Sequence, residues 1–354
     1  MTTMPKNISE IDKNFSTVES YNKDGFSYYN IDNEPFRIYG VFREGDRYRR
    51  MPEDVAKSVS EGVHFLHSNT AGGRVRFKTD SATVRIVAKM GNTGRMQHFA
   101  FTGSVGFDLY EKTDDGYNYI STYVPPFEVN GDFEGSIGLE CKKLRDLTIN
   151  FPLYSDVCEL HIGLEDGSVL LPGDEYKPEP PIVYYGSSIT QGGCASRSGT
   201  SYQGFICRKF DRDFINLGFS GNARAEDNMI EYICSLPMSV FVEDYDHNSP
   251  DTDHLRATHE KLFKAVRAKY PDIPIVIMSR PKYYLTDEES ERLEIIRETY
   301  NNAVAAGDKN VYILDGRQLM EAAGNEGTVD NCHPTDLGFA SMAKALGDLF
   351  ADIL

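Results

Sequence analysis

Short runs of alternating apolar and polar residues fill the first half of the chain, after a polar lead-in of about 30 residues. A period of two is typical of strands with one buried face. Turn-forming pairs such as Gly91-Asn92 separate the runs, and no helical pattern of ten or more residues occurs before residue 180. We therefore predict an all-β sandwich of jelly-roll type. Its clearest strands carry the alternating triplets Val84, Ile86 and Ala88; Leu147, Ile149 and Phe151; and Leu160, Ile162 and Leu164.

The pattern changes after a stiff proline-rich connector, Lys177-Pro178-Glu179-Pro180-Pro181, so we place a domain boundary between residues 1–174 and 175–354. Beyond it, apolar runs alternate with stretches of helical spacing. Strands separated by helices favour a parallel sheet covered on both faces. We predict a flavodoxin-like, three-layer α/β domain with about five parallel strands, at Ile182–Tyr185, Phe214–Leu217, Val240–Val242, Ile275–Met278 and Val311–Leu314.

Candidate chemistry lies just after these strands, at the sheet edge where open α/β sheets bind their ligands. Ser188 follows the first strand of the second domain, two residues after Gly186, which allows a tight turn. A serine at such a turn points its hydroxyl out of the sheet and is a candidate nucleophile. In the alternative interpretation, Ser187 and Ser188 only cap the next helix.

Two further polar segments follow the second and third strands. Gly221, in Gly218-Phe219-Ser220-Gly221, could present a backbone N–H group to an oxyanion, and Asn248 could add its side-chain amide. The alternatives are an ordinary glycine turn and a local Asx-type turn before Pro250. His247 is more typical of a structural histidine than of a general base.

The segment Asp330-Asn331-Cys332-His333-Pro334 precedes a long C-terminal helix. The three-residue offset lets Asp330 reach Nδ1 of His333 while Nε2 faces the serine. This is the arrangement that serine hydrolysis requires. A capped helix start with a chance His-Pro pair is the alternative.

Taken together, these segments resemble the SGNH (GDSL-type) hydrolases over roughly residues 180–354. The resemblance implies that Ser188 is the nucleophile, His333 the general base and Asp330 its acidic partner. It also implies an oxyanion hole made by the backbone N–H groups of Ser188 and Gly221 with the amide of Asn248. The chain departs from the family pattern at Ser187, where an aspartate is usual, and at Tyr245-Asp246-His247-Asn248, which replaces G-x-N-D.

The segment Gly106-Phe107-Asp108-Leu109-Tyr110 resembles the G-x-D-L-Y signature of a β-domain found ahead of certain SGNH domains. That layout is similar to carbohydrate esterases with a jelly roll before the hydrolase, and it implies deacetylation of sugars. The alternative is a turn and an edge strand with a tyrosine in the core. Whether this domain binds sugar or is only structural stays open.

Small residues after the nucleophile, such as Gly192 and Gly193, predict an open, polar entrance to the active site. Such an entrance suits a short acyl group, and our hypothesis is an acetyl group on a sugar. The candidate substrate contacts are Arg197, Tyr202 and Arg280, with surface salt bridging as the alternative for each arginine. The proposed mechanism requires no cofactor, and no metal-ligand spacing occurs.

Bulk properties narrow the partners and the location. A net charge of −17 disfavours nucleic acid and anionic membranes as partners. The sequence contains no stretch of 18 apolar residues, so it predicts no membrane-spanning helix. Met1–Glu19 lacks the apolar segment of a signal peptide, so we expect a cytoplasmic protein. Six cysteines without a C-x-x-C pair are expected to be reduced.

We therefore expect a serine esterase that acts on a small-molecule or oligosaccharide ester, with homo-oligomerisation left open. A lysophospholipase or thioesterase on the same triad would instead need an apolar groove for a long acyl chain. A catalytically dead glycan-binding protein is the alternative from another class.

Overall fold

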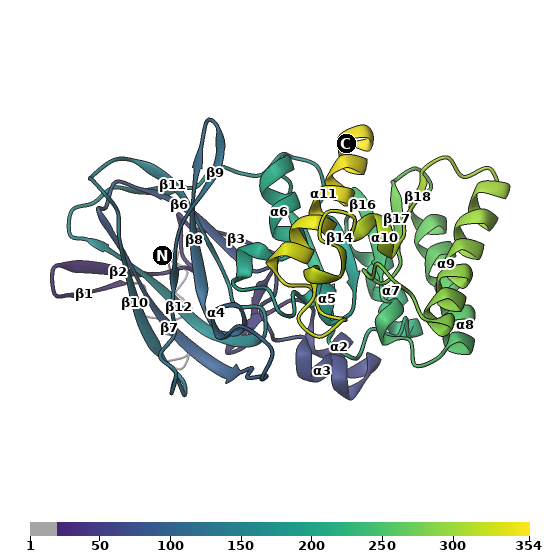
Figure 1. Ribbon diagram of the computed structural model, residues 1–354. Helices are drawn as coiled ribbons and strands as arrows, with labels where there is room; N and C mark the ends of the chain where they lie inside the picture. The colour runs from purple at the N-terminus through teal and green to yellow at the C-terminus, as the bar shows by residue number, and fades with distance from the viewer. Residues whose placement is uncertain (1–19) are drawn as a thin grey trace, which may run out of the picture.

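The computed structural model describes residues 20–354 (Figure 1). The prediction made for Met1–Glu19 lies outside this part of the chain. Within it, the expected polar lead-in is wrong for residues 20–30, which form a hairpin of β1 (Ser20–Lys23) and β2 (Phe26–Asn30). Two tyrosines stabilise this hairpin, because the rings of Tyr21 and Tyr28 stack with centroids 4.8 Å apart and Tyr28 is buried.

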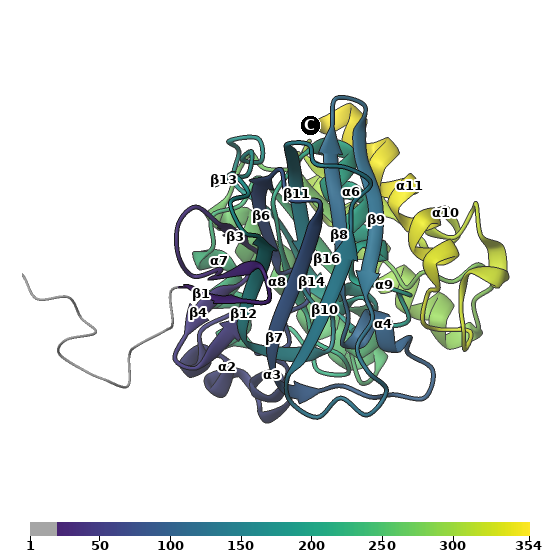
Figure 2. The same cartoon turned by 90° about the vertical axis from the view of Figure 1, so that its left-hand side faces the viewer.

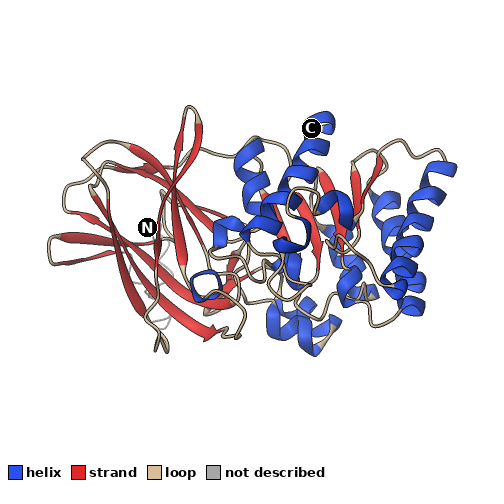
Figure 3. Cartoon of the chain, in the orientation of Figure 1, coloured by secondary structure: helices blue, strands red, loops and turns tan. Residues whose placement is uncertain are grey.

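The first half of the chain forms two large antiparallel sheets that face each other (Figures 2 and 3), and β4 and β5 pair in a separate two-stranded sheet. The strand orders are β1-β2-β12-β7-β10 and β13-β6-β11-β8-β9, and β3 also pairs with β6. The three alternating triplets predicted from the sequence are buried between these sheets, which confirms the predicted sandwich. The remaining strands are β3 (Arg37–Tyr39), β4 (Phe42–Glu44), β5 (Arg47–Arg49), β6 (Arg74–Thr79), β7 (Thr83–Thr93), β8 (Phe107–Thr113), β9 (Gly116–Tyr123), β10 (Phe133–Gly138), β11 (Arg145–Asn150), β12 (Ser155–Glu165) and β13 (Leu170–Pro172).

The second half contains a five-stranded parallel sheet in the order β15-β14-β16-β17-β18. In this order the second strand of the domain, β15, lies at the edge of the sheet, and the first strand, β14, lies between β15 and β16. This is the flavodoxin-like order, so the fold prediction is confirmed. Separate apolar clusters cover the two faces and give three layers. The strands are β14 (Ile182–Gly186), β15 (Phe214–Gly218), β16 (Val240–Asp244), β17 (Ile275–Met278) and β18 (Val311–Leu314). The helices are α5 (Ser188–Gln191), α6 (Tyr202–Phe210), α7 (Asp227–Ser235), α8 (Thr252–Lys269), α9 (Asp287–Ala305), α10 (Gly316–Leu319) and α11 (Asp336–Ile353).

Three short helices interrupt the β-rich first half: α2 (Glu53–Val59), α3 (Glu61–Leu66) and α4 (Phe101–Ser104). At four to seven residues they are too short to produce a helical pattern in the sequence. The first two belong to the second domain's core, where Val63 and Leu66 pack in one apolar cluster with Phe219. Figure 1 shows them against the second domain. Among residues 20–354, no helix combines the length and the apolar character needed to cross a bilayer.

Two buried arginines from the first half hold β15, Arg50 at its end and Arg74 at its start. One guanidinium nitrogen of Arg50 donates to the carbonyl oxygens of Asn216, at 3.1 Å, and Gly218, at 2.6 Å. The other donates to the carbonyl of Leu66 at 2.7 Å, and the guanidinium lies 4.8 Å from the centre of the Phe219 ring. Arg74 pairs with Asp213 and stacks 3.9 Å from the centre of the Phe214 ring. These contacts fix the two halves of the chain relative to each other.

Replacing Arg50 with methionine keeps the apolar stem but leaves three buried carbonyl groups without this donor. We expect the free energy of unfolding of Arg50→Met to fall by about 2–4 kcal/mol, measured by urea denaturation. The control is Arg256→Met, which breaks only an exposed pair with Glu298 and should change stability by about 0.5 kcal/mol or less. Equal stabilities for the two variants would contradict this role of Arg50.

Candidate active site

Ser188 begins helix α5 directly after β14, because the chain turns sharply at Gly186. A Cβ atom on Gly186 would lie 2.0 Å from Oγ1 of Thr190 and 2.2 Å from the carbonyl oxygen of Asp244, so only glycine fits. Ser187 is the cap of the helix, and its Oγ accepts a hydrogen bond from the N–H of Ile189. The hydroxyl of Ser188 is therefore left for another partner.

That partner is His333, 145 residues further along the chain, whose Nε2 lies 2.9 Å from Oγ of Ser188. On the other side of the ring, Nδ1 lies 2.8 Å from Oδ2 of Asp330. The loop around Asp330 is tightly wound, because Oδ1 accepts from the backbone N–H groups of Cys332, at 3.1 Å, and His333, at 2.7 Å. The structure thus brings the three predicted residues into one hydrogen-bonded chain of hydroxyl, imidazole and carboxylate.

The charge on Asp330 suits this arrangement. Partial burial opposes its ionisation, but the hydrogen bonds from the backbone and ring of His333 and the charge of that ring outweigh it and lower the pKa of Asp330. An ionised carboxylate at Nδ1 holds the proton on that nitrogen and leaves Nε2 as the acceptor toward Ser188.

Gly221 and Asn248 lie at the same sheet edge. Gly186 is in register with Gly218 on one side and Asp244 on the other, so the segments that follow these three strands start side by side. Gly221 has a φ of +73°, and Oδ1 of Asn248 accepts from the N–H of Ala223 at 3.2 Å. This bond holds Asn248 against the Gly221 turn. Because it uses the side-chain oxygen, the amide N–H₂ group of Asn248 stays available for another partner. The oxyanion-hole role of Ser188, Gly221 and Asn248 stays a prediction.

The three candidate substrate contacts are all engaged within the protein. Tyr202 is completely buried and its hydroxyl lies 3.0 Å from Asp244, so it is out of a substrate's reach. Arg280 donates three hydrogen bonds to Asp246, at 3.0–3.2 Å, and thereby holds the turn that carries Asn248. Arg197 stacks 3.9 Å from the centre of the Tyr119 ring and donates to the hydroxyl of Tyr110.

The Gly106–Tyr110 segment joins the two domains. Asp108 is fully buried, and its carboxylate accepts hydrogen bonds from the side chain of Asn150, at 2.7 Å, and from the backbone N–H of Gly199, at 2.8 Å. Gly199 belongs to the second domain, so the motif's aspartate binds a turn that follows the nucleophile helix. The alternative of an edge strand is wrong, because this segment leads into β8, which lies between β11 and β9.

Side chains from the first domain also contact the site, and no sequence pattern predicted them. The ring centre of His98 lies 5.3 Å from that of His333, and its Nε2 is 3.9 Å from Oδ2 of Asp330. Phe99 packs edge-to-face on His333 at 5.7 Å, and the hydroxyl of Tyr154 donates to the carbonyl oxygen of Ser188 at 3.0 Å. His98 and Phe99 lie in a loop, where periodicity carries no information.

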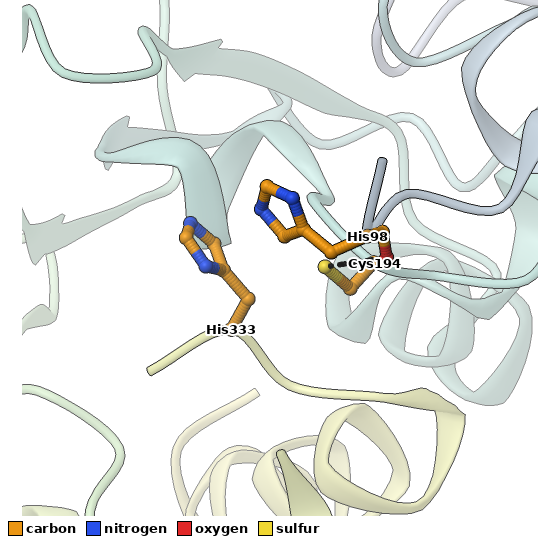
Figure 4. A group of neighbouring side chains, drawn as sticks. All are labelled: His98, Cys194 and His333. Carbon is orange, nitrogen blue, oxygen red and sulfur yellow. Dashed lines mark hydrogen bonds between the residues drawn. The ribbon is translucent and has the colours of Figure 1, made fainter. Parts of the chain in front are cut away.

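Figure 4 shows His98, Cys194 and His333 together, and their metal-ligating atoms lie within 4.8 Å of one another. Nitrogen and sulfur donors suit zinc. However, both ring nitrogens of His333 already have partners in Ser188 and Asp330, and burial raises the pKa of the Cys194 thiol to about 12. A metal ion would have to displace one of those hydrogen bonds and the thiol proton, so we assign His333 to the hydrogen-bonded chain.

Comparison with known proteins adds two family matches. Residues 179–351 match the GDSL-like lipase/acylhydrolase family, and residues 26–170 match the N-terminus of SGNH_hydro-type esterases, described by the letters GxDLY. Among curated proteins, no sequence matches.

Several solved structures are similar to this chain over most of its length. A protein from Bacteroides ovatus described as a GDSL-like lipase is 25% identical, with a TM-score of 0.83 over 93% of this chain and 98% of that one. The salicylyl-acyltransferase SsfX3 of a tetracycline biosynthetic pathway is 17% identical, with a TM-score of 0.75 over 94% and 98%. A family two carbohydrate esterase from Clostridium thermocellum is 16% identical, with a TM-score of 0.62 over 90% and 98%.

Behind the nucleophile helix, Asp244 is fully buried and accepts hydrogen bonds from Thr190, at 2.8 Å, and Tyr202. Burial raises the pKa of Asp244 from 3.8 to about 7, although both hydrogen bonds oppose the shift. A raised pKa means that the folded protein holds this proton more tightly than the unfolded chain does. The resulting stability is fully present below about pH 3.8 and is lost as the pH rises through about 7.

When the pH rises from about 4 to about 8, the melting temperature of the unaltered protein should fall, and that of Asp244→Asn should fall less, because asparagine has no proton to lose. Scanning calorimetry across this range measures the difference, and Asp115→Asn, at an exposed turn, should leave the profile unchanged. Parallel profiles for Asp244→Asn and the unaltered protein would show that Asp244 does not titrate in this way.

Proposed function

Because the chain belongs to the GDSL-like lipase/acylhydrolase family with a GxDLY-type N-terminal domain, we propose that it is a serine esterase using Ser188, His333 and Asp330. The observation that carries the proposal is the continuous chain of hydrogen bonds, 2.9 Å from Ser188 to His333 and 2.8 Å from His333 to Asp330.

In the proposed first step, Oγ of Ser188 attacks the ester carbonyl carbon while Nε2 of His333 takes the hydroxyl proton. Asp330 stabilises the imidazolium that forms. The N–H groups of Ser188 and Gly221 and the amide of Asn248 stabilise the oxyanion, and each such donor contributes about 3–4 kcal/mol in comparable enzymes. His333 then gives its proton to the leaving alcohol oxygen, and an acyl-enzyme remains. Water repeats these steps and releases the acid.

A short acyl group on a carbohydrate is our proposed substrate. Small residues follow the nucleophile, and a family two carbohydrate esterase shares the two-domain fold. The similarity to a salicylyl-acyltransferase supports one second candidate, transfer of the acyl group to an alcohol in place of water. The acyl-enzyme is common to both reactions, so product analysis with an added alcohol as acceptor separates them.

The first test is the nucleophile itself. Ser188→Ala should lower kcat on 4-nitrophenyl acetate by at least about 10³-fold, because the hydroxyl forms the covalent intermediate. A fluorophosphonate probe should label the unaltered protein and not this variant, as measured by intact-protein mass spectrometry. The control is Ser187→Ala, which removes only a helix cap and should keep the label. A glycan-binding protein without catalysis would show neither turnover nor labelling in any variant.

The second test is the length of the acyl chain. We expect kcat/KM for 4-nitrophenyl acetate to exceed that for 4-nitrophenyl octanoate by at least about tenfold. The opposite preference would reject the sugar-acetyl proposal and favour a lysophospholipase or thioesterase.

A further inference from the structure

A cavity of about 400 Å³ lies beside the candidate active site, and the first domain builds most of it. Ten of its twelve lining residues come from residues 1–174: helix α3 and Asn69 after it, the end of β7 and the loop after it, and Tyr154 directly before β12. Only Ser220 and Asn222 come from the second domain. In Figures 1 and 2, α3 and one end of β7 lie together at the bottom of the molecule.

The cavity adjoins the nucleophile. Tyr154 lines it, and the hydroxyl of this tyrosine donates to the carbonyl oxygen of Ser188. Ser220 and Asn222 flank Gly221, the proposed oxyanion donor, and the N–H of Ser220 donates to Gln191 in the nucleophile helix. Helix α3 fits tightly here, since a Cβ atom on Gly62 would lie 1.9 Å from Oδ1 of Asn222. A group bound in the cavity would therefore lie next to a carbonyl held at Ser188.

The lining combines exposed apolar faces with amides. Phe65 exposes 64% of its surface and Met96 exposes 37%, and Asn92 and Asn222 add polar side chains. A volume of about 400 Å³ falls within the usual range of small-ligand pockets and far exceeds the two carbons of an acetyl group. A pyranose ring matches this lining, because its C–H faces pack on aromatic rings and its hydroxyl groups bond to amides.

A second exposed aromatic residue is held beside the cavity. Arg95, another lining residue, donates to the carbonyl oxygens of Phe127 and Val129, each at 2.7 Å, and its guanidinium lies 4.8 Å from the centre of the Phe101 ring. Phe127 exposes 77% of its surface. The two terminal guanidinium nitrogens thus fix this loop, and the Phe127 ring, whose centre lies 6.4 Å from that of Phe101, stays largely exposed in a defined place.

We propose that this cavity binds the sugar ring that carries the ester, so that the first domain selects the alcohol part of the substrate. The proposal rests on the esterase function given above and adds the place and the chemical class of the leaving group. In it, Phe65 and Met96 supply the apolar surface for one face of the ring, while the acyl group stays at the oxyanion turn.

The test compares a sugar ester with an ester that has no sugar, using the full chain. For Phe65→Ala and Met96→Ala, kcat/KM on glucose pentaacetate should fall at least tenfold, mainly through KM, and that on 4-nitrophenyl acetate should change less than twofold. Phe42→Ala, an exposed aromatic residue of the same domain outside the cavity, should change neither value. Both cavity residues are partly exposed, so the variants should keep the melting temperature of the unaltered protein.

Two results would overturn the proposal: an equal loss on both substrates at unchanged melting temperature, or a shift in acyl-chain preference among 4-nitrophenyl esters without a loss on the sugar ester. The second result would assign the cavity to the acyl group. Calorimetric binding of glucose pentaacetate to Ser188→Ala, weakened at least tenfold when Phe65→Ala is added, tests the cavity without turnover. If the unaltered protein hydrolyses neither ester, the proposed function fails, while this binding measurement still decides on the cavity.

Discussion

A buried polar joint between the two halves of the chain determines the geometry of everything around Ser188. Arg50 and Arg74 from the first half bind backbone and ring groups of β15, and Asp108 binds the backbone of the turn at Gly199. Charged groups without water are costly unless they are fully paired, so these contacts tolerate little displacement of one half against the other. The loop with His98 and Phe99 consequently reaches His333 from the opposite domain.

The site separates two kinds of carboxyl group by their surroundings. Asp330 is partly exposed and receives hydrogen bonds from two backbone N–H groups and an imidazole, which favour its charge. Asp244 is fully buried behind α5, the helix that begins with Ser188, and this burial favours its neutral form. Only the first can support a positive imidazole, while the second holds Thr190 and Tyr202 and so anchors the helix that begins with Ser188.

The strands of both domains and the residues after them are predictable from the sequence, because alternation, strand–helix order and sheet-edge placement all leave a pattern in the chain. Ser188 is predicted in this way, while Asp330 and His333 are predicted from their three-residue spacing before the C-terminal helix, with His333 145 residues from Ser188. Residue type alone suggests Arg197, Tyr202 and Arg280 as substrate contacts, whereas in the structure Tyr202 is buried and both arginines have partners inside the protein. His98, Phe99 and Tyr154 were not predicted, because their position depends on how two domains pack.

The short helices α2 and α3 have a consequence for how such proteins can be recombined. They are encoded more than 100 residues before β14, yet their apolar side chains fill the same cluster as Phe219 and Ala223. A chain cut at the proline-rich connector would leave that cluster open to water next to the turn at Gly221. The two halves therefore are not exchangeable modules. A hydrolase half moved into another protein would have to include the segment from Arg50 to Leu66.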